Sequence, residues 1–351
     1  MRLYLYFLLL FYWYLRILIK TLRVNFRFAL CGLVTLMKNN KKNPRIPIEY
    51  VQLATQNFHS QNCIGGGEFG NVYKGNLHDG GDGFKTIVAK RFDTRFGKGE
   101  QQFLSELQVL SEYKHENVIG LVGYCDEKDE KIIIYEYASR GSLDRYLNDV
   151  CLTWVKRLNI CIEVANALDF LHGGVGKQSR LIHRDIKTAN ILLNHDWKTK
   201  LADFGLSLIL PINQETDFVI DRACGTTGYL DPLYKKAGFL TIESDIYSFG
   251  VVLFEILCGR STFATHEHEG YYLPDFIRNR FKEGKLDDVV FERIREQMEP
   301  KALAIFQTIA YQCLHYEREK RPTIQEVITQ LKTALEIQVS NHDTILFLYM
   351  Q

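Results

Sequence analysis

Two different patterns of hydrophobic residues divide the chain near Tyr137. Before that point, short alternating runs at 71–77 and 86–92 flank a glycine-rich turn and predict antiparallel strands. One helix interrupts these strands at 100–113, where apolar residues recur at helical spacing. After Tyr137, helical stripes predominate. A change of this kind restricts the fold to one in which a β-rich part precedes a helical part.

The order of the two patterns predicts an α+β protein with two lobes. We expect a small, mainly antiparallel β lobe with one main helix at about 48–137, and a larger, mainly α lobe at about 138–338. Residues 1–47 form an apolar and basic segment with a linker, and 339–351 form a tail. A cleft between two such lobes is a natural place for a ligand.

The N-terminal segment contains an uninterrupted apolar run at 3–15. A membrane-spanning helix needs roughly 20 apolar residues, so this run is short. Basic residues on its C-terminal side would hold the rest of the chain in the cytoplasm. Three interpretations stay open: a signal anchor or membrane-surface segment, a cleaved targeting peptide, and a wrongly assigned gene start.

The formal net charge of +1 hides an asymmetry. Residues 1–48 carry nine Lys/Arg and no acid, whereas the remainder carries 34 basic and 42 acidic residues. A mildly acidic body argues against polymeric nucleic acid as a partner. The eight cysteines include no C-x-x-C pair, which favours reduced thiols of a cytosolic protein over disulfides or zinc.

A glycine-rich string at 65–72 is the first candidate for ligand binding. It has the form G-x-G-x-x-G-x-V, which alone is a weak signal. A dinucleotide site needs a helix next, but the residues after this string alternate like a strand. The glycines would then close a hairpin over phosphates. Lys90 ends a buried-strand pattern and needs a carboxylate, for which Glu106 on the predicted helix is the candidate; the alternative is a lysine that reaches solvent from an edge strand.

The strongest signal is the string H-R-D-I-K-T-A-N at 183–190, followed by D-F-G at 203–205. Two carboxylates, an amide and a lysine at this spacing can serve one phosphoryl transfer. One carboxylate accepts the proton of a hydroxyl, while the other carboxylate and the amide hold magnesium. Both strings in one chain are very improbable by chance.

These motifs resemble those of eukaryotic protein kinases, in the branch of plant receptor-like kinases and their animal Pelle-type relatives. The resemblance covers roughly 48–338. Similarity to the branch rests on further strings, which are L-A-T-Q-N-F at 53–58, H-E-N-V at 115–118, G-Y-C at 123–125, G-T-T-G-Y-L-D-P at 225–232 and S-D-I-Y-S-F-G at 244–250.

The resemblance implies a bilobal protein-kinase fold, ATP and Mg²⁺ (with Mn²⁺ as an alternative), and a role for each matching residue. Asp185 is the catalytic base, Lys187 steadies the γ-phosphate, and Lys90 paired with Glu106 binds the α- and β-phosphates. Asn190 and Asp203 are the expected metal ligands. The expected ATP contacts, besides Lys90, are Ile64, Gly65, Gly66, Gly67, Glu68, Phe69, Gly70, Val72, Val88, the bulky Tyr135 next to adenine, the hinge residues Glu136, Tyr137 and Ala138, and Leu192 under the adenine ring.

The same resemblance implies hydroxyl specificity and regulation. Lys187 after the aspartate and Thr226 after Gly225 match the serine/threonine pattern, although occasional tyrosine transfer stays open. Arg184 beside Asp185 implies pairing with a phosphorylated activation loop. Candidate phosphosites are Thr216, Thr226 and Thr227. Thr226 is expected to contact Asp185, which favours a structural role over a switch.

Two residues depart from the family pattern. Val88 replaces the usual alanine two positions before the lysine, and its methyls are expected to crowd the adenine face. Leu233 replaces the glutamate that normally follows Pro232. In the family, that glutamate pairs with an arginine matched here by Arg321. Unless Arg321 reaches water or another acid, we expect a looser activation segment, which restoring Glu at position 233 would repair.

The sequence therefore predicts a protein serine/threonine kinase acting on protein substrates in receptor-like-kinase signalling. The alternative is a nucleotide-binding pseudokinase scaffold, which Val88 and Leu233 support and the complete set of reactive residues opposes. We expect a plasma-membrane-associated chain with its kinase domain in the cytosol, or a soluble cytoplasmic one. Since no ectodomain precedes the apolar run, the chain would relay for an upstream receptor or kinase.

Overall fold

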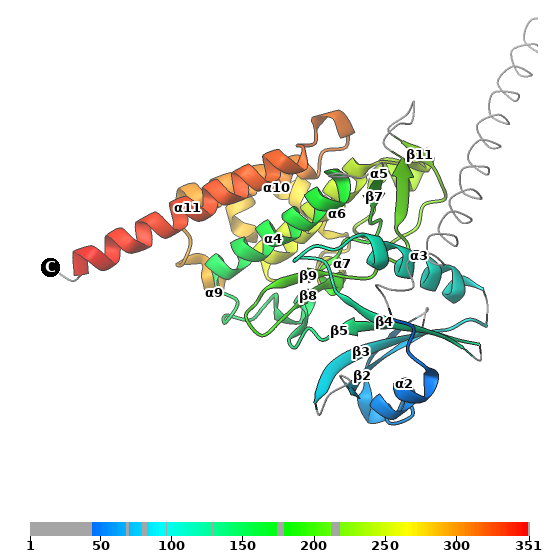
Figure 1. Cartoon of the computed structure of the whole chain (residues 1–351). Coiled ribbons are helices and arrows are strands. Elements are labelled where there is room, and N and C mark those ends of the chain that lie inside the picture. Colours follow the sequence, from blue (N-terminus) through cyan, green and yellow to red (C-terminus); the bar gives the residue numbers. More distant parts are fainter. Residues whose placement is uncertain are drawn as a thin grey trace, which may run out of the picture.

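The computed structural model describes residues 44–67, 70–78, 83–95, 97–127, 129–173, 179–211 and 218–349. At Pro211 and at 341–349 it describes the backbone alone. The apolar N-terminal run therefore lies outside the described residues. Within them the chain forms the two lobes that the sequence predicts, a sheet with a helix on one side and a larger helical body on the other (Figure 1).

The N-terminal lobe is a five-stranded antiparallel sheet in the order β1-β2-β3-β5-β4. The strands are β1 (Cys63–Gly67), β2 (Gly70–His78), β3 (Phe84–Phe92), β4 (Leu121–Glu127) and β5 (Glu130–Glu136). Two helices accompany the sheet, α2 (Ile48–Ala54) and α3 (Lys98–Glu112).

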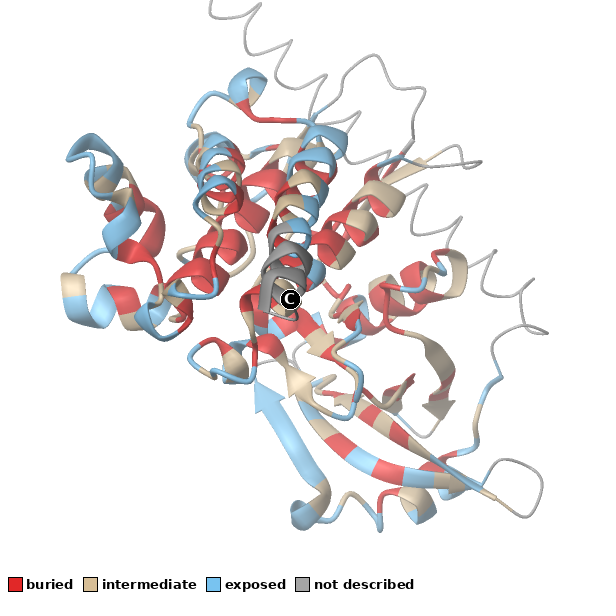
Figure 2. Ribbon diagram, turned by 90° about the vertical axis from the view of Figure 1, so that its left-hand side faces the viewer, coloured by how far each residue is buried: buried red, intermediate tan, exposed pale blue. Residues whose placement is uncertain are grey.

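Alternation along β3 gives the sheet two different faces. Ile87 and Ala89 are buried in a small core with α2, whereas Val88 points to the opposite face and packs against the main hydrophobic core. Since side chains alternate along a strand, Lys90 shares the face of Val88. Figure 2 shows this alternation along the strands, and shows β1 as exposed throughout. The face that carries Lys90 is therefore the one turned toward the C-terminal lobe.

The C-terminal lobe is built on long helices. These are α4 (Trp154–Gly173), α6 (Ile242–Cys258), α10 (Pro300–Cys313) and α11 (Ile324–Tyr349), with the shorter α5 (Pro232–Ala237), α7 (Thr262–Glu269), α8 (Leu273–Lys282) and α9 (Glu292–Arg295) around them. The helix α11 continues without a break through residue 339, where the sequence places the start of a tail. The domain boundaries stay predictions.

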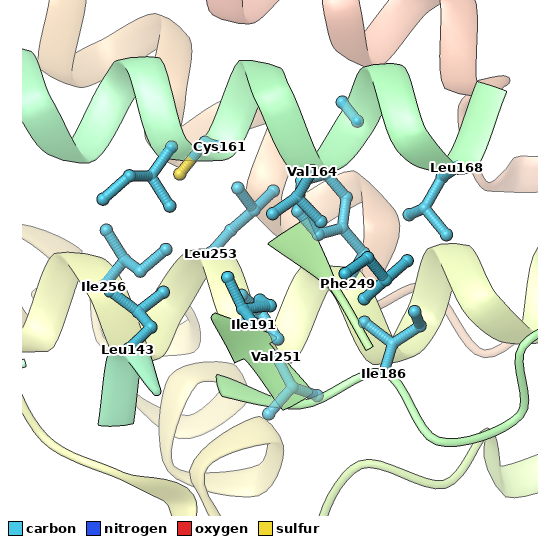
Figure 3. Packing of buried hydrophobic residues seen from close by; sticks show 14 of the residues in the cluster. Leu143, Cys161, Val164, Leu168, Ile186, Ile191, Phe249, Val251, Leu253 and Ile256 are labelled. Carbon is cyan, nitrogen blue, oxygen red and sulfur yellow. The ribbon is translucent and has the colours of Figure 1, made fainter. Parts of the chain in front are cut away.

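The core of this lobe lies between α4 and α6. Cys161, Val164 and Leu168 of α4 meet Phe249 and the neighbouring apolar residues of α6 (Figure 3). Burial of aliphatic surface of this kind, at about 25 cal/mol per Å², is the main force that fixes the two helices together. Ile186, which lies between Asp185 and Lys187, and Ile191, which follows Asn190, are also wholly buried in this core. The loop between them is thereby anchored at both ends.

Short strands complete the C-terminal lobe. They are β6 (Gly141–Ser142), β8 (Ile191–Leu193) and β9 (Thr199–Leu201) in one sheet, β7 (Ser179–Ile182) paired with β10 (Leu208–Pro211), and β11 (Val219–Ile220) paired with β12 (Phe239–Leu240). Seven cysteines lie among the described residues and all are free thiols. Four of them are buried, while Cys63 and Cys151 are exposed.

Candidate active site

The structure brings Lys90 together with two carboxylates. The Lys90 Nζ donates to Glu106 Oε2 at 2.9 Å and to Asp203 Oδ1 at 2.7 Å. Strand β3 supplies the lysine, α3 supplies the glutamate, and Asp203 comes from the loop after β9. Lys90 of the N-terminal lobe is thus bonded to Asp203 of the C-terminal lobe.

Neighbouring charges keep the Lys90 ammonium and the Asp203 carboxylate ionised. Burial by itself lowers the pKa of the Lys90 ammonium, but the Asp203 and Glu106 carboxylates outweigh it, so that this pKa lies above its ordinary value. Burial also opposes ionisation of Asp203, and Lys90 overcomes it, which leaves the pKa of Asp203 below its ordinary value. At neutral pH the site therefore presents a cation and an anion side by side.

The catalytic-loop residues converge on the Asp185 carboxylate. Its Oδ1 accepts hydrogen bonds from the Thr226 backbone N–H at 3.0 Å and from the Thr226 hydroxyl at 2.6 Å. Its Oδ2 accepts from Lys187 Nζ at 2.7 Å and from the Asn190 amide nitrogen at 3.1 Å. Asp185 is only 7% exposed. A carboxylate with four donors around it is fixed in one orientation.

The two groups of residues lie close to each other. The backbone N–H of Ala202 donates to Asn190 O at 2.9 Å, which places Asp203 directly beside the catalytic loop. Lys187, which bonds Asp185, is near enough to help lower the pKa of Asp203. Lys90, Asp185, Asn190 and Asp203 therefore form one continuous cluster.

Asn190 and Asp203 fit the expected binding of a magnesium ion. The amide nitrogen of Asn190 donates to Asp185 O at 2.8 Å and to its carboxylate, so the amide oxygen is the atom that can ligate a cation. Within the described ranges, no three His, Cys, Asp or Glu residues are grouped to hold a metal. One amide oxygen and one carboxylate are ligands of the kind that Mg²⁺ takes from a protein, since it usually completes its shell with phosphate and water.

A buried aspartate on α6, Asp245, positions the catalytic loop. Its carboxylate accepts from the backbone N–H groups of His183 at 2.8 Å and Arg184 at 2.9 Å, and contacts His172 Nε2 at 2.9 Å. Burial opposes ionisation of Asp245, but these contacts hold its pKa below the ordinary value. Arg184 adopts a φ of 73°, and Asp245 stabilises this left-handed backbone.

A second buried acid on α6, Glu255, joins the catalytic loop to the segment after Gly225. It accepts from the Thr188 hydroxyl at 2.8 Å, the Tyr229 hydroxyl at 2.6 Å and the Thr262 N–H at 2.6 Å. Sequence reasoning assigned no role to Asp245 or Glu255. The available signal was the presence of these two acids in a mostly apolar helix, since burying an acid is costly unless it has partners.

The glycine-rich hairpin follows the expected path. Ile64, Gly65, Gly66 and Gly67 are exposed in β1, and Val72 pairs with Lys90 in the register of β2 and β3. Gly70 has a φ of 135°, and a Cβ there would lie 2.0 Å from the Arg91 backbone oxygen, so no other residue fits without a shift. Glu68 and Phe69 lie outside the described residues.

The expected adenine contacts line the adjacent strand and loop. Tyr135 is buried at the end of β5 and pairs with Val88 in register, and Leu192 of β8 packs against the same core. Burial raises the pKa of the Tyr135 phenol, and the charge of Glu106 adds to the rise. The three hinge residues follow Tyr135. The Glu136 carboxylate accepts from the Gly120 N–H and pairs with Lys200. The Lys74 ammonium lies over the ring of Tyr137, and Ala138 is buried.

Arg321 is not the orphan charge that the Leu233 substitution suggested. Its guanidinium donates to Asp231 Oδ1 at 2.9 Å, and both side chains are fully buried. Arg318 bonds the other oxygen, Oδ2, at 3.0 Å. Arg321 therefore reaches another acid, which is the condition under which the loss of the glutamate at position 233 does not loosen the activation segment, because Asp231, two residues earlier, takes the place of that glutamate. Leu233 itself is 39% exposed.

The candidate regulatory residues lie in different surroundings. Thr226 is engaged with Asp185 and Lys187, the latter at 2.8 Å. Thr227 is exposed, and Thr216 lies outside the described residues. Arg184 is buried to 8% side-chain exposure and bonds Asp221 and Tyr234.

Comparison with known proteins gives one consistent result. A family model described as "Protein tyrosine and serine/threonine kinase" matches residues 58–331. The receptor-like protein kinase HERK 1 of Arabidopsis thaliana is 40% identical over 300 residues, which are 84% of this chain and 35% of that protein. The receptor-like protein kinase ANXUR2 of the same plant is 38% identical over 298 residues, with 84% and 34% covered. The chain thus spans about a third of the length of these relatives.

The two-lobed fold and the cluster of Lys90, Asp185, Asn190 and Asp203 define a protein kinase. The chain belongs to the plant receptor-like kinase family, as its motifs suggested, and the pseudokinase alternative is not favoured. Across the described residues, no single helix is long and apolar enough to cross a membrane. One pair of helices, Ile242–Cys258 and Thr262–Glu269, has the length and composition only when taken together, and the two are bent by 72°.

Proposed function

We propose that this protein kinase transfers the γ-phosphate of ATP to serine and threonine hydroxyls of protein substrates, with Mg²⁺ (or Mn²⁺) as its metal. The observation that carries the proposal is the paired arrangement of charges, Lys90 with Asp203 and Lys187 with Asp185. Phosphoryl transfer passes through a loose, anionic transition state, which is stabilised mainly by cations and alignment.

Each charged residue has a role that its surroundings explain. Lys90 stays protonated and is held by Glu106, so it can bind phosphate oxygens. Asp185 needs only to orient a hydroxyl and accept its proton, and its carboxylate already accepts a hydroxyl hydrogen bond from Thr226. Lys187 can neutralise the transferring group. Asn190 and Asp203 would hold the metal, which when bound supplies positive charge to the phosphates.

The serine/threonine preference rests on Thr226. This residue bridges Asp185 and Lys187 through its hydroxyl, which fixes the segment after Gly225 close to the catalytic base. A segment this close supports acceptor hydroxyls on short side chains over the longer tyrosine. The matching family model covers both specificities, so the preference is a proposal.

The test is an autophosphorylation assay of the full-length chain with Mg²⁺ and ATP, after which the labelled residue type is identified. We expect phosphoserine and phosphothreonine, and we expect Asp185→Asn to lower transfer by about a hundredfold or more, because the base no longer accepts a proton. Asp288→Asn, an identical change at an exposed site on the far part of the C-terminal lobe, is the matched control. Label mainly on tyrosine would refute the specificity, and equal transfer by the Asp185 variant would refute the mechanism.

We also propose that the kinase domain works at the cytosolic face of the plasma membrane and relays for an upstream receptor or kinase. Support comes from the receptor-like relatives and from the basic residues after the apolar run at 3–15. A fluorescent reporter fused to residues 1–45 is expected to label the cell periphery. Diffuse cytosolic fluorescence would favour the soluble alternative instead.

A further inference from the structure

The surroundings of Arg184 suggest how the kinase is regulated. Its guanidinium donates to Asp221 Oδ2 at 2.8 Å, to the Tyr234 hydroxyl at 2.5 Å and to Arg222 O at 3.3 Å. The Tyr234 hydroxyl in turn donates to Arg222 O at 2.9 Å. Among the residues that the structure describes, Asp221 is the only carboxylate in an ion pair with Arg184.

A guanidinium this deeply buried needs an anion. Taking the charge out of water costs several kcal/mol unless a negative group compensates it. The sequence suggested that a phosphorylated residue of the activation loop would be that anion. The structure instead provides a carboxylate from the same segment, with no added group.

Asp221 is itself held in place. It directly follows β11, which pairs with β12, and its backbone N–H donates to Gly238 O at 2.9 Å. Its second oxygen, Oδ1, accepts from the Arg222 N–H at 2.7 Å. A Cβ on Gly238, which has a φ of 71°, would lie 2.8 Å from Asp221 O. Figure 1 shows β11 and α5 beside β7, the strand that leads into the catalytic loop. Hydrogen bonds to neighbouring residues thus hold both the backbone and the side chain of Asp221.

We propose that Asp221 is a positioning residue that replaces an activation-loop phosphate, so that this kinase is active without prior phosphorylation. Asp221 acts through Arg184, whose backbone is fixed by Asp245 and whose neighbour Asp185 is the catalytic base. Together they tie the activation segment to the catalytic loop permanently. This inference rests on the proposed kinase function.

The experiment measures transfer to casein by full-length protein that phosphatase has treated and that intact mass shows to be free of phosphate. We expect progress curves that are linear from the first time point, and a gain of less than about twofold when the enzyme is first incubated with Mg·ATP. Asp221→Asn should lower the initial rate by about tenfold or more, mainly in kcat, because a charged hydrogen bond to a buried group is lost. Asp221→Glu keeps the charge and should stay within about threefold of the parent.

Controls separate positioning from simple loss of structure. Asp288→Asn should match the parent, and the Tm of each variant is measured alongside its rate. Adding Asp221→Asn to Arg184→Gln should not lower the initial rate any further, since both residues act through one ion pair. The inference alone would be overturned by any of three results. These are rate losses that add in the double variant, an Asp221→Asn rate equal to that of the parent, and a phosphate-free parent that shows a lag and gains about tenfold in rate from incubation with Mg·ATP. A parent inactive in both states would overturn the proposed function and the inference with it.

Discussion

Glu255 is an unusual residue because it is an acid with no exposed surface. Burial raises its pKa from 4.5 to about 7, against the hydrogen bonds from Tyr229, Thr262 and Thr188 that favour the charged form. In the unfolded chain the same carboxyl titrates near its ordinary value. Between these two pKa values the folded protein retains a proton that the unfolded chain releases.

The difference between the two states sets the sign of the pH dependence. Since the folded state binds more protons, Glu255 makes the free energy of unfolding fall as the pH rises from about 4.5 to about 7. A difference of this size corresponds to about 3 kcal/mol. We expect Glu255→Gln to remove this part of the pH dependence in denaturant titrations from pH 5 to pH 8. Parallel pH profiles of parent and variant would contradict the assignment.

At the scale of elements, the segment from Gly225 to α5 is fastened to the rest of the lobe by Asp231. This residue caps α5 by accepting from the Leu233 N–H at 3.0 Å, and it bonds the Ser244 hydroxyl at the start of α6 at 2.9 Å. With Arg318 and Arg321, three parts of the chain meet at one carboxylate. One buried acid, Asp231, thus joins α5, the start of α6 and the two arginines, in place of the family glutamate.

Removing that acid should loosen all three parts. Asp231→Asn leaves Arg321 buried without an anion, and breaking a buried pair in this way typically costs about 3–5 kcal/mol. We expect the free energy of unfolding to fall by about 3 kcal/mol or more, measured with urea. Leu233→Glu should change stability by less than about 0.5 kcal/mol and leave activity nearly unchanged, because the position is partly exposed and Arg321 is already paired. A several-fold rise in activity from Leu233→Glu would show that Asp231 does not satisfy the arginine.

At the scale of the whole molecule, much of the fold could be predicted because its signals are local. The strand expected at 86–92 is found at Phe84–Phe92, and the helix expected at 100–113 is found at Lys98–Glu112. Glycine turns and apolar spacing mark both. The reactive residues could also be found, since their spacing lies within two short strings.

The rest depends on contacts between residues that are distant in the sequence. Asp245 bonds His183 across 62 positions, Arg184 bonds Asp221 across 37, and Arg321 bonds Asp231 across 90. Periodicity and spacing carry no information about such pairs, so the substitution at Leu233 suggested an orphan charge where the fold supplies a partner. These long-range hydrogen bonds and ion pairs hold the predicted elements in one working arrangement.

The central claim is that Lys90, Asp185, Asn190 and Asp203 gather around one metal-bound triphosphate. Calorimetric titration of the full-length chain with ATP, with and without Mg²⁺, tests it most directly. We expect Mg²⁺ to tighten ATP binding by about tenfold, Asp203→Asn to abolish that gain, and Asp185→Asn to keep it, since Asp203 is the metal ligand and Asp185 the base. No ATP binding by the parent, or an unchanged gain from Mg²⁺ in the Asp203 variant, would contradict the account.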